Sequence, residues 1–508
     1  MLSFNLIDNP WVPVADVGRV SLMDVFIHPV YRALGGNPVQ KIALMKLLLA
    51  IAQAACTPKD EAEWKALGVE GMAKACREYL EKWHDRFDLY GGKPFLQMPG
   101  IGQAAIQPYG AVAPDIATGN TTVLLQSQIE RSLLDADRAM LLLEQMAFAL
   151  SGKKADNSIV LSPGYTRKKN DKGKPSSSKP GSAVAHMGLL HNFWQGETLQ
   201  TTLWLNLLSE QDVMNSGFYP GGVGVAPWEA MPTGEDCPVA QKLRDSLQGR
   251  LIPLGRFCLL GEQGLHYSEG ILHRNYKEGV VDPSAAVDFS GKEPKALWTD
   301  PQKRPWRELT ALLSFFGRNG NQGFSCLQLR ARSGIRGVVS QFGLWSGGLR
   351  VSSNAGEQYV SGTDDFVESA IWFFGEKLGE RWFAAWQAEM QALDQLSKTL
   401  YGCVMAYFKA QTVDGKKMAA EATPLFWQLC EREVQHLVDA CNAADSTPRI
   451  ELRRRFAAYL QQTYDQFCPR ETSRQMDAWA QCRPNVGRYL ATNEGETLER
   501  NKQTTLAF

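Results

Sequence analysis

The sequence has no net charge, because 54 lysine and arginine residues are matched by 54 aspartate and glutamate residues. This balance excludes attraction to a polyanion through the overall field, so any affinity for nucleic acid has to come from locally clustered basic residues. No apolar run reaches the roughly 20 residues of a membrane-spanning helix. The best candidate, residues 42–56, contains Lys46 and Gln53, which favours a buried helix of a globular protein.

Cysteine pairs at metal-binding spacing are also absent. The ten cysteines are scattered along the chain without a C-x-x-C motif, so neither a zinc ribbon nor a disulfide framework is indicated. We interpret them as reduced core thiols of a cytoplasmic protein. The first residues, MLSFNLIDNPWVPV, lack a charged segment followed by an apolar one, so no secretory signal is evident.

Motifs that identify common enzyme classes are missing as well. The sequence contains no P-loop, no G-x-S-x-G elbow and no H-E-x-x-H among its seven histidines. His84 and Asp85 are adjacent, as in metal-dependent phosphohydrolases, but a partly exposed helical histidine beside Trp83 is the favoured interpretation of the pair. His186 and His191 are five residues apart without an obvious third ligand. We therefore expect no catalytic residue, no metal and no cofactor.

The first part of the chain lacks a regular pattern of secondary structure. With 508 residues, roughly two to four domains of about 100 to 200 residues are expected. Through residue 364, short apolar segments broken by Gly, Pro and Asn mix with helical runs, which predicts an irregular mixed domain over 1–364. Within it we expect strands at 203–208 and 254–260 and a helix at 131–150.

The composition changes near residue 365. Apolar residues recur at spacings of three and four from Trp382 to Tyr407, which predicts one long amphipathic helix. Three more such segments follow, at 426–441, at 452–467 and from 476 onward, joined by the short polar connections VDGKK, DSTPR and PRETS. Short connections make neighbouring helices antiparallel. The predicted fold class is α+β, with an irregular mixed N-terminal domain followed by a C-terminal four-helix bundle over 365–508.

Basic and small polar side chains in two loops stand out from this background. Between 153 and 182 there are eight basic and two acidic residues among Gly, Ser and Pro, and such a segment cannot form a core. A flexible linker and an anion-binding loop both fit it, since lysines release counterions on meeting phosphates and glycines let backbone amides approach. The second loop, SGGLRVSSNAG at 346–356, is a Gly-bounded polar tip that suits a tight hairpin.

Three consecutive arginines, Arg453, Arg454 and Arg455, lie on the third predicted bundle helix. Successive residues of a helix point in different directions, so at least two of the three must reach solvent. A solvated helix face and contact with nucleic-acid phosphates are both compatible with this pattern.

Several segments resemble a known family when they are taken together in order. They are FNLIDNPWVPV from residue 4, the apolar segment 42–56 with TPKDEAEW after it, PFLQMPG from residue 94 and GGLR from residue 347. This ordered set is similar to the CasA family, the large subunit of the type I-E CRISPR Cascade complex. The resemblance extends to the terminal bundle. It implies a cytoplasmic, non-catalytic subunit of an RNA-guided ribonucleoprotein complex that acts in antiviral defence.

The resemblance also implies a division of labour in which base pairing with the CRISPR RNA reads the target. The large subunit recognises the protospacer-adjacent motif of foreign double-stranded DNA from the minor groove, starts strand separation and helps to recruit a helicase-nuclease. The implied partners are this DNA, the CRISPR RNA, the other Cascade subunits and the helicase-nuclease, without a membrane. A His-Asp phosphohydrolase and a scaffold subunit without motif reading are the alternatives.

The resemblance carries the family's functional loops to particular positions of this sequence. The minor-groove loop corresponds to Lys168, Lys169, Lys172, Lys174, Ser177, Ser178, Lys179 and Gly181. The wedge that inserts beside the first base pair corresponds to Ser352, Ser353, Asn354 and Ala355, where the family's usual glutamine is absent. The loop that touches the motif and the guide corresponds to Asn120 and Gln126. A minor-groove lysine falls near Arg274 and Lys277, and the arginines at 453–455 are assigned to the displaced strand.

Overall fold

The computed structural model describes residues 3–112, 132–148, 155–165, 188–274, 276–317, 323–332, 335, 338–352, 358–359, 366–374 and 378–490, with the backbone alone at 111, 351–352 and 358–359. The chain divides into two compact units. Unit 1 is Met1–Pro305 with Asn321–Ala370, and unit 2 is Trp306–Gly320 with Ile371–Phe508. The division passes within β13 (Phe366–Phe374), a few residues beyond the boundary expected at residue 364, and places 306–320 with the helical unit.

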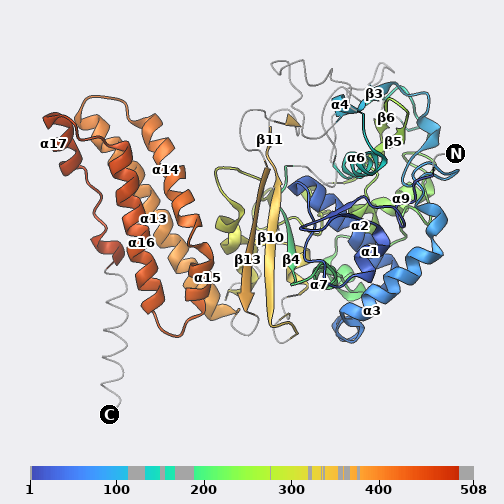
Figure 1. Cartoon of the computed structure of the whole chain (residues 1–508), viewed down its shortest axis with the longest axis horizontal. Helices are drawn as coiled ribbons and strands as arrows, with labels where there is room; N and C mark the ends of the chain where they lie inside the picture. The colour runs from blue at the N-terminus through green and yellow to red at the C-terminus, as the bar shows by residue number, and fades with distance from the viewer. Residues whose placement is uncertain are drawn as a thin grey trace, which may run out of the picture. The chain divides into compact units, whose positions relative to one another are not determined.

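Unit 1 combines helices with small sheets (Figure 1). Its α-helices are α1 (Leu22–Ile27), α2 (Pro38–Cys56), α3 (Glu61–Lys82), α4 (Tyr109–Val112), α6 (Asp135–Ala147), α7 (Leu199–Asn206), α8 (Glu210–Ser216), α9 (Pro238–Arg244), α10 (Gln248–Leu251) and α12 (Leu327–Arg330). Its strands are β1 (Val12–Val14), β2 (Gly18–Val20), β3 (Ile106–Pro108), β4 (His191–Gln195), β5 (Arg256–Leu260), β6 (Gly264–Glu269), β7 (Val287–Asp288), β8 (Lys295–Ala296), β9 (Phe324–Ser325), β10 (Gln341–Leu349), β11 (Val351–Ser352) and β12 (Gln358–Tyr359), besides β13.

The described strands form five small sheets, with the orders β1-β2, β13-β10-β4, β11-β12, β3-β6-β5 and β8-β7-β9. Neighbouring strands run antiparallel wherever their register is defined. Helix α2 packs on β10 and helix α7 on β4, so this sheet has a buried face. The absence of a doubly wound parallel sheet among the described strands agrees with the predicted mixed architecture.

Helix α2 is the core helix of unit 1. Asn37 and Gln40 form a capping box at its start, and Pro38 occupies the first turn, where its missing N–H costs nothing. By length and composition α2 could cross a membrane, but 72% of its apolar window is buried inside unit 1. Its largely apolar sequence therefore reflects burial within unit 1, where Lys46 and Gln53 are buried as well.

The local predictions in unit 1 are partly confirmed. The expected helix at 131–150 is α6 and the expected strand at 254–260 is β5. The strand expected at 203–208 is wrong, because most of that segment belongs to helix α7. Thr198 starts this helix by accepting a hydrogen bond from the Thr201 amide. The segment is buried all round, and an apolar run of this kind has no period that distinguishes a strand from a helix.

Unit 2 contains the predicted C-terminal helical bundle. Its described elements are α11 (Leu309–Leu312), α13 (Glu380–Ala410), α14 (Lys416–Glu431), α15 (Val434–Asn442), α16 (Thr447–Phe467) and α17 (Ser473–Gln481), with short 3-10 turns at Pro305–Glu308 and Ser314–Phe316. Helix α13 contacts α14, α15, α16 and α17, so it is the central helix. The second expected bundle helix is interrupted at 432–433 and forms α14 and α15.

A group of buried ionisable residues lies at the centre of unit 1. The Lys46 ammonium pairs with the Asp282 carboxylate, and both side chains are almost fully buried. Asp282 Oδ1 also accepts from the Ser284 hydroxyl at 2.7 Å and the Ser284 amide at 3.0 Å. Burial raises the pKa of Asp282, but the Lys46 charge and these hydrogen bonds outweigh it and leave the pKa below its ordinary value. The carboxylate is therefore charged and compensated inside the core.

His273 is a neutral member of the same region. Its Nε2 lies 2.6 Å from the Pro253 carbonyl oxygen. A carbonyl only accepts hydrogen bonds, so the ring proton is on Nε2. Burial, followed by the positive charge of Arg250, lowers the pKa of His273 well below its ordinary value of 6.5. The imidazole consequently stays neutral in the folded chain.

Replacing Lys46 with Met should lower the free energy of unfolding by about 3–5 kcal/mol, because it leaves a buried carboxylate without its counter-charge. Lys41→Met is the matched control. Its partner Glu368 is 38% exposed and the loss should stay below about 1 kcal/mol. Urea unfolding of the two variants measures the difference. Equal losses would contradict the buried ion pair as a centre of stability.

Stability should also fall as the pH drops below about 6.5. His273 is protonated in the unfolded chain there but resists protonation in the folded chain, so each pH unit removes up to about 1.4 kcal/mol until the depressed folded pKa is reached. His273→Gln removes this titration, and its unfolding free energy should vary less between pH 7.5 and pH 5.5. An identical slope in the wild-type and His273→Gln proteins would refute the assignment.

Candidate nucleic-acid interface

The wedge predicted from the resemblance coincides with a hairpin. Strand β10 continues into β11, which pairs antiparallel with β12 through Val351↔Tyr359 and Ser352↔Gln358. Ser352 is therefore the last residue of β11, and Ser353, Asn354 and Ala355 follow it outside the described residues. Figure 1 shows β11 at the upper end of the long strand β10. The predicted wedge thus begins on a short strand that directly follows β10.

The residues assigned to the minor-groove loop and to the guide loop lie outside the described part of the chain. These are Lys168, Lys169, Lys172, Lys174, Ser177, Ser178, Lys179 and Gly181, together with Asn120 and Gln126. The structure does describe the residues on either side of both loops. Val112 and the start of α6 flank the guide loop, and Tyr165 and Gly188 flank the minor-groove loop.

Residues that follow the minor-groove loop and precede the wedge hairpin meet in unit 1. His191, shortly after the minor-groove loop, is paired with Gly347, which precedes the wedge hairpin. The ring of Phe148, which ends α6 ahead of the segment 149–154, lies edge-on to His191 with 6.0 Å between ring centroids. Residues 148, 191 and 347 are far apart in the sequence but form one contiguous contact. The loops that leave from them therefore start from a common edge.

Two glycines allow the backbones to come this close. A Cβ atom on Gly348 would lie 2.8 Å from the Leu189 carbonyl oxygen, and one on Gly347 would lie 2.7 Å from the Trp345 ring. Both distances are shorter than a carbon side chain tolerates. A Gly-Gly pair within a strand is a known signal of close backbone approach, although the sequence alone does not identify the neighbouring segment.

A chain of hydrogen bonds fixes the start of β4. The Ser284 hydroxyl donates to Asp282, so the 2.8 Å contact between His191 Nδ1 and the same hydroxyl makes the imidazole the donor. Asp282 in turn pairs with Lys46 of α2. The edge at which the predicted loops begin is therefore tied to the core helix of unit 1.

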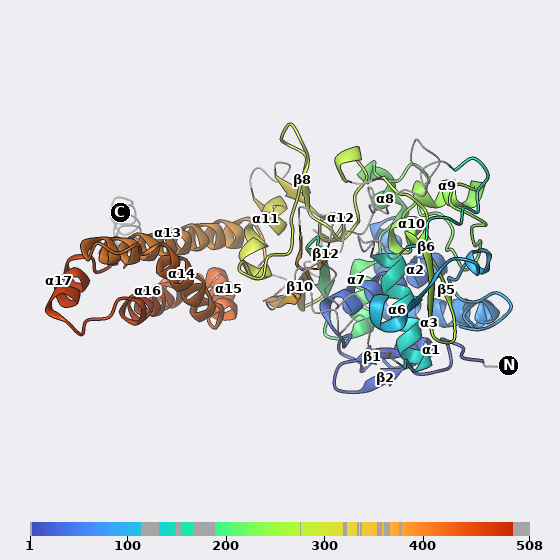
Figure 2. The ribbon, with the colours of Figure 1, turned by 90° about the horizontal axis from the view of Figure 1, so that it is seen from above.

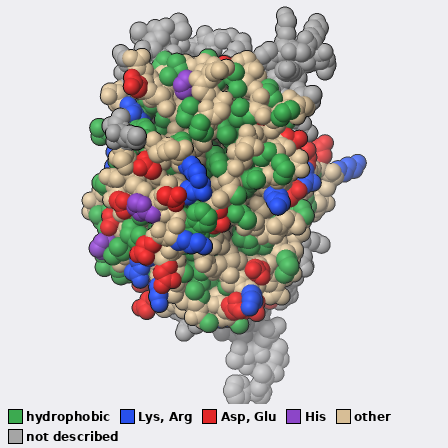
Figure 3. Space-filling view, turned by 90° about the vertical axis from the view of Figure 1, so that its right-hand side faces the viewer, with side chains coloured by type: hydrophobic (Ala, Val, Ile, Leu, Met, Phe, Trp, Pro, Cys, Tyr) green, Lys and Arg blue, Asp and Glu red, His purple; other side chains and the backbone are tan. Residues whose placement is uncertain are grey.

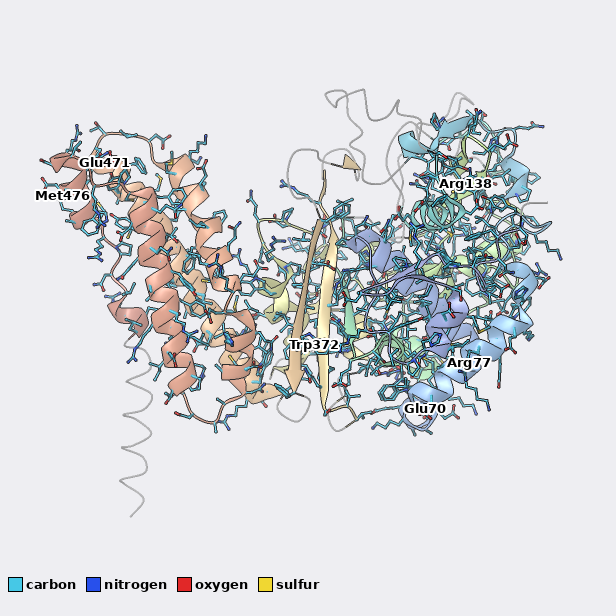
Figure 4. All side chains as sticks on the ribbon, in the orientation of Figure 1. Glu70, Arg77, Arg138, Trp372, Glu471 and Met476 are labelled. Atoms are coloured by element: carbon cyan, nitrogen blue, oxygen red, sulfur yellow. The ribbon has the colours of Figure 1, made fainter. Side chains whose placement is uncertain are left out.

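The basic side chain near the start of α6 is already engaged within unit 1. Arg138, labelled in Figure 4, extends from α6, and its guanidinium donates to the Tyr90 hydroxyl at 3.0 Å and the Glu262 carbonyl at 3.3 Å. The face of unit 1 in Figure 3 mixes basic, acidic and apolar side chains without a field of one sign.

Arg274 and Lys277 are the candidates for the minor-groove lysine. Arg274 ends the described segment 188–274, and Lys277 lies near the start of the next one, 276–317. Arg274 is about half exposed and forms an ion pair with Asp245, while its carbonyl oxygen accepts from Arg250 at 3.1 Å. Lys277 is exposed in the 3-10 turn Tyr276–Glu278. Both side chains are accessible, so the structure does not choose between them.

The three consecutive arginines of α16 have different environments. Arg453 is buried, and its guanidinium binds both carboxylate oxygens of Glu389 at 2.9 and 3.0 Å. Arg454 and Arg455 are exposed, as expected for at least two of the three. Arg455 pairs with Glu433 and Glu451 at the surface. Arg453 is thus occupied inside the bundle, and the assignment to the displaced strand remains a prediction for Arg454 and Arg455.

The His-Asp pair has none of the surroundings of a metal centre. His84 Nε2 contacts the Asp8 carboxylate at 2.8 Å, whereas Asp85 is 72% exposed and pairs with Arg86. His191 is engaged by Ser284, and His186 lies outside the described residues. Within the described part of the chain, no group of three or more His, Cys, Asp or Glu side chains could hold a metal ion. The ten cysteines are all described and form no disulfide.

Known proteins show the expected family relationship. The family model of the CRISPR-associated protein Cse1 matches residues 5–467. The CasA/Cse1 protein of Thermus thermophilus is 32% identical over 163 residues, which cover 29% of this chain and 32% of that relative. The chain thus aligns with about a third of this curated relative's length.

Solved structures share the fold over nearly the whole chain. Thermobifida fusca Cse1 superposes with a TM-score of 0.74 at 20% identity, covering 96% of this chain and 98% of the other. Thermus thermophilus CasA gives 0.72 at 19% identity, covering 96% and 100%. A chain of a CRISPR RNA-guided surveillance complex gives 0.69 at 16% identity, covering 95% and 99%. The resemblance to the CasA family is confirmed, and this chain belongs to the CRISPR-associated Cse1 family.

Proposed function

We propose that the chain is the non-catalytic large subunit of a type I-E CRISPR surveillance complex. In this role it recognises the protospacer-adjacent motif of foreign double-stranded DNA from the minor groove and starts to separate the strands. The observation that carries the proposal is the pairing of His191 with Gly347, which brings the end of the lysine-rich segment and the start of the wedge hairpin to one edge of unit 1, with Phe148 packed against His191.

The chemistry of the minor-groove loop supports phosphate contact with degenerate base reading. Lysines neutralise phosphates in any sequence, whereas glycine and serine allow backbone groups to approach the groove floor. The minor groove distinguishes A·T from G·C pairs but hardly A·T from T·A. A loop of this composition should therefore accept several related motifs.

The attachment of the wedge hairpin to strand β10 supports its proposed role in strand separation. Separating one base step costs roughly a few kcal/mol, so the inserted group has to be held by a stiff support. The hairpin of β11 and β12 continues the sheet strand β10, and Gly347 of that strand is paired with β4. In this chain a serine or Asn354 takes the place of the family's glutamine, which gives the wedge a shorter polar tip.

The partners follow from the same role. Base pairing of the target with CRISPR RNA would supply sequence specificity, and the other Cascade subunits would hold the guide. The bundle of unit 2 would face the small subunits and the displaced strand, with Arg454 and Arg455 contacting phosphates. A helicase-nuclease recruited after target binding would carry out the degradation in the cytoplasm, since no catalytic constellation stands out among the described residues.

The first test replaces the five loop lysines, Lys168, Lys169, Lys172, Lys174 and Lys179, with alanine in the assembled complex. Binding to motif-bearing duplex should weaken, and the slope of log K against log salt should fall by as much as about 4, because each lost phosphate contact removes about 0.9. The matched control replaces five exposed lysines of unit 1, Lys59, Lys65, Lys74, Lys82 and Lys93. This control should leave both the affinity and the slope unchanged.

Two outcomes of this experiment would contradict the proposal. Unchanged DNA affinity in the five-lysine variant would remove the loop from the interface. Equal binding of motif-bearing and motif-free duplexes by the wild-type complex would instead favour the scaffold subunit without motif reading. If the chain showed metal-dependent hydrolysis and His84→Ala abolished it, this result would support the alternative of a His-Asp phosphohydrolase.

The second test concerns the displaced strand. Arg454→Ala with Arg455→Ala should lower the salt slope for binding a target with an opened strand by about 1.4, since a single-strand phosphate contact contributes about 0.7. The melting temperature should hardly change. Arg453→Ala should instead destabilise the bundle by about 3–5 kcal/mol, because it leaves the buried Glu389 carboxylate unpaired. Salt titrations and thermal unfolding separate the two roles, and an unaltered slope in the double variant would exclude the displaced-strand contact.

A further inference from the structure

Trp298 has an unusual environment for a tryptophan of this protein. All fourteen tryptophans lie in the described part of the chain. Trp298 is the only one that is exposed, with 43% of its surface accessible. Large aromatic surfaces are normally buried because their exposure to water is unfavourable. An exposed ring on a rigid segment is therefore a candidate contact for another molecule.

The backbone around Trp298 is held in an extended conformation. Trp298 forms a β-bridge with Leu189, the Thr299 amide donates to the Gly188 carbonyl at 2.8 Å, and the Leu190 amide donates to the Leu297 carbonyl at 3.0 Å. The indole also hydrogen-bonds to Tyr276, which is half-buried. The position of the ring is thus defined by the backbone and by a polar contact.

This segment lies at the edge where the predicted DNA-contacting loops begin. Leu189, the bridge partner of Trp298, is the second described residue after the lysine-rich loop. Thr299 is in close contact with Gly348, shortly before the wedge hairpin. Figure 2, the view from above, shows β8, which precedes Trp298, in the same part of unit 1 as β10 and β12.

The two sequence segments that carry the aromatic pair contain more basic than acidic residues, since Glu278 and Asp300 stand beside four cations. Arg274 and Lys277 lie on either side of Tyr276 in the sequence, and Lys303 and Arg304 follow Trp298 within six residues. Proteins that bind unpaired nucleic acid combine aromatic rings, on which bases stack, with basic residues that follow the phosphates. A protein partner could also use an exposed tryptophan, but the neighbouring cations match nucleic acid more closely.

We propose that Trp298, positioned by Tyr276, stacks on an unpaired base of the target DNA next to the motif. The proposal rests on the proposed function, because it requires a duplex that opens at the wedge. In a closed duplex each base face is covered by its neighbours, so the ring has nothing to stack on. An unpaired base offers its face, and the contact would then hold the strands apart.

The experiment compares wild-type chain, Trp298→Ala and Trp298→Phe in the assembled complex. The probe is a motif-bearing duplex with 2-aminopurine in place of the first base that becomes unpaired. Stacking quenches this fluorophore, so Trp298→Ala should give brighter emission and about tenfold weaker binding, the usual loss for one stacked base. Trp298→Phe keeps an aromatic face and should stay close to wild type. Phe289→Ala, at another exposed ring of unit 1 that packs on Phe218, should behave as wild type.

A second duplex, with an interstrand crosslink that prevents opening, isolates the stacking contact. Wild type and Trp298→Ala should bind it equally. A tenfold difference on this closed duplex would overturn the proposal, as would equal emission and affinity on the opening duplex. Failure of Trp298→Ala to join the complex would assign the ring to a protein partner and also overturn it. The proposed function fails separately, when wild type neither distinguishes motif-bearing DNA nor opens it.

Discussion

The pairing of β4 with β10 is the constraint on which the rest of the interface depends. It joins the strand that follows the lysine-rich loop to the strand that precedes the wedge hairpin, through His191 and Gly347. At the adjacent Gly348, the Thr299 side chain and the Leu189 carbonyl oxygen occupy the space of a side chain, which favours glycine there. Below the sheet, His191 is linked through Ser284 and Asp282 to Lys46 of the core helix. The starting points of the loops proposed to contact DNA are thereby fixed, as in other binding loops on rigid scaffolds.

The distribution of charge limits unspecific attraction to DNA. The chain is neutral overall, and basic residues in its interior, such as Lys46 and Arg453, are paired with carboxylates. Non-specific affinity grows with the number of phosphates that a protein neutralises. Only eight of the 54 basic residues are clustered in the segment 153–182, which keeps that number small. Such a protein would leave DNA without the motif quickly, as the proposed function requires.

The parts of the fold that follow a sequence period could be predicted, whereas the meeting of distant segments could not. The helices of unit 2 and α6 carry apolar residues at spacings of three and four. In the structure these residues form the buried faces of the helices. The sequence also carries the information that Arg453 is buried. Leu452, Phe456 and Leu460 define the inward face of α16, and Arg453 lies on that face. The fully buried α7 has no such period, so its sequence predicts a strand as readily as a helix. The contact of residues 148, 191 and 347 arises from the topology of the chain, and no local sequence pattern predicts it.

Strand separation places a physical requirement on the interface that the basic loop does not meet. Lysine contacts with phosphates are present in closed and opened DNA alike, so they strengthen binding without favouring either state. An equilibrium shifts only through contacts that differ between its two states. The small polar residues of the wedge gain little surface contact to offset the lost base stacking of roughly a few kcal/mol. An exposed aromatic ring beside the hairpin differs in this respect, because it finds a base face only after the duplex has opened. The lysines would therefore determine how tightly DNA is held, and the aromatic ring how far the opened state is populated.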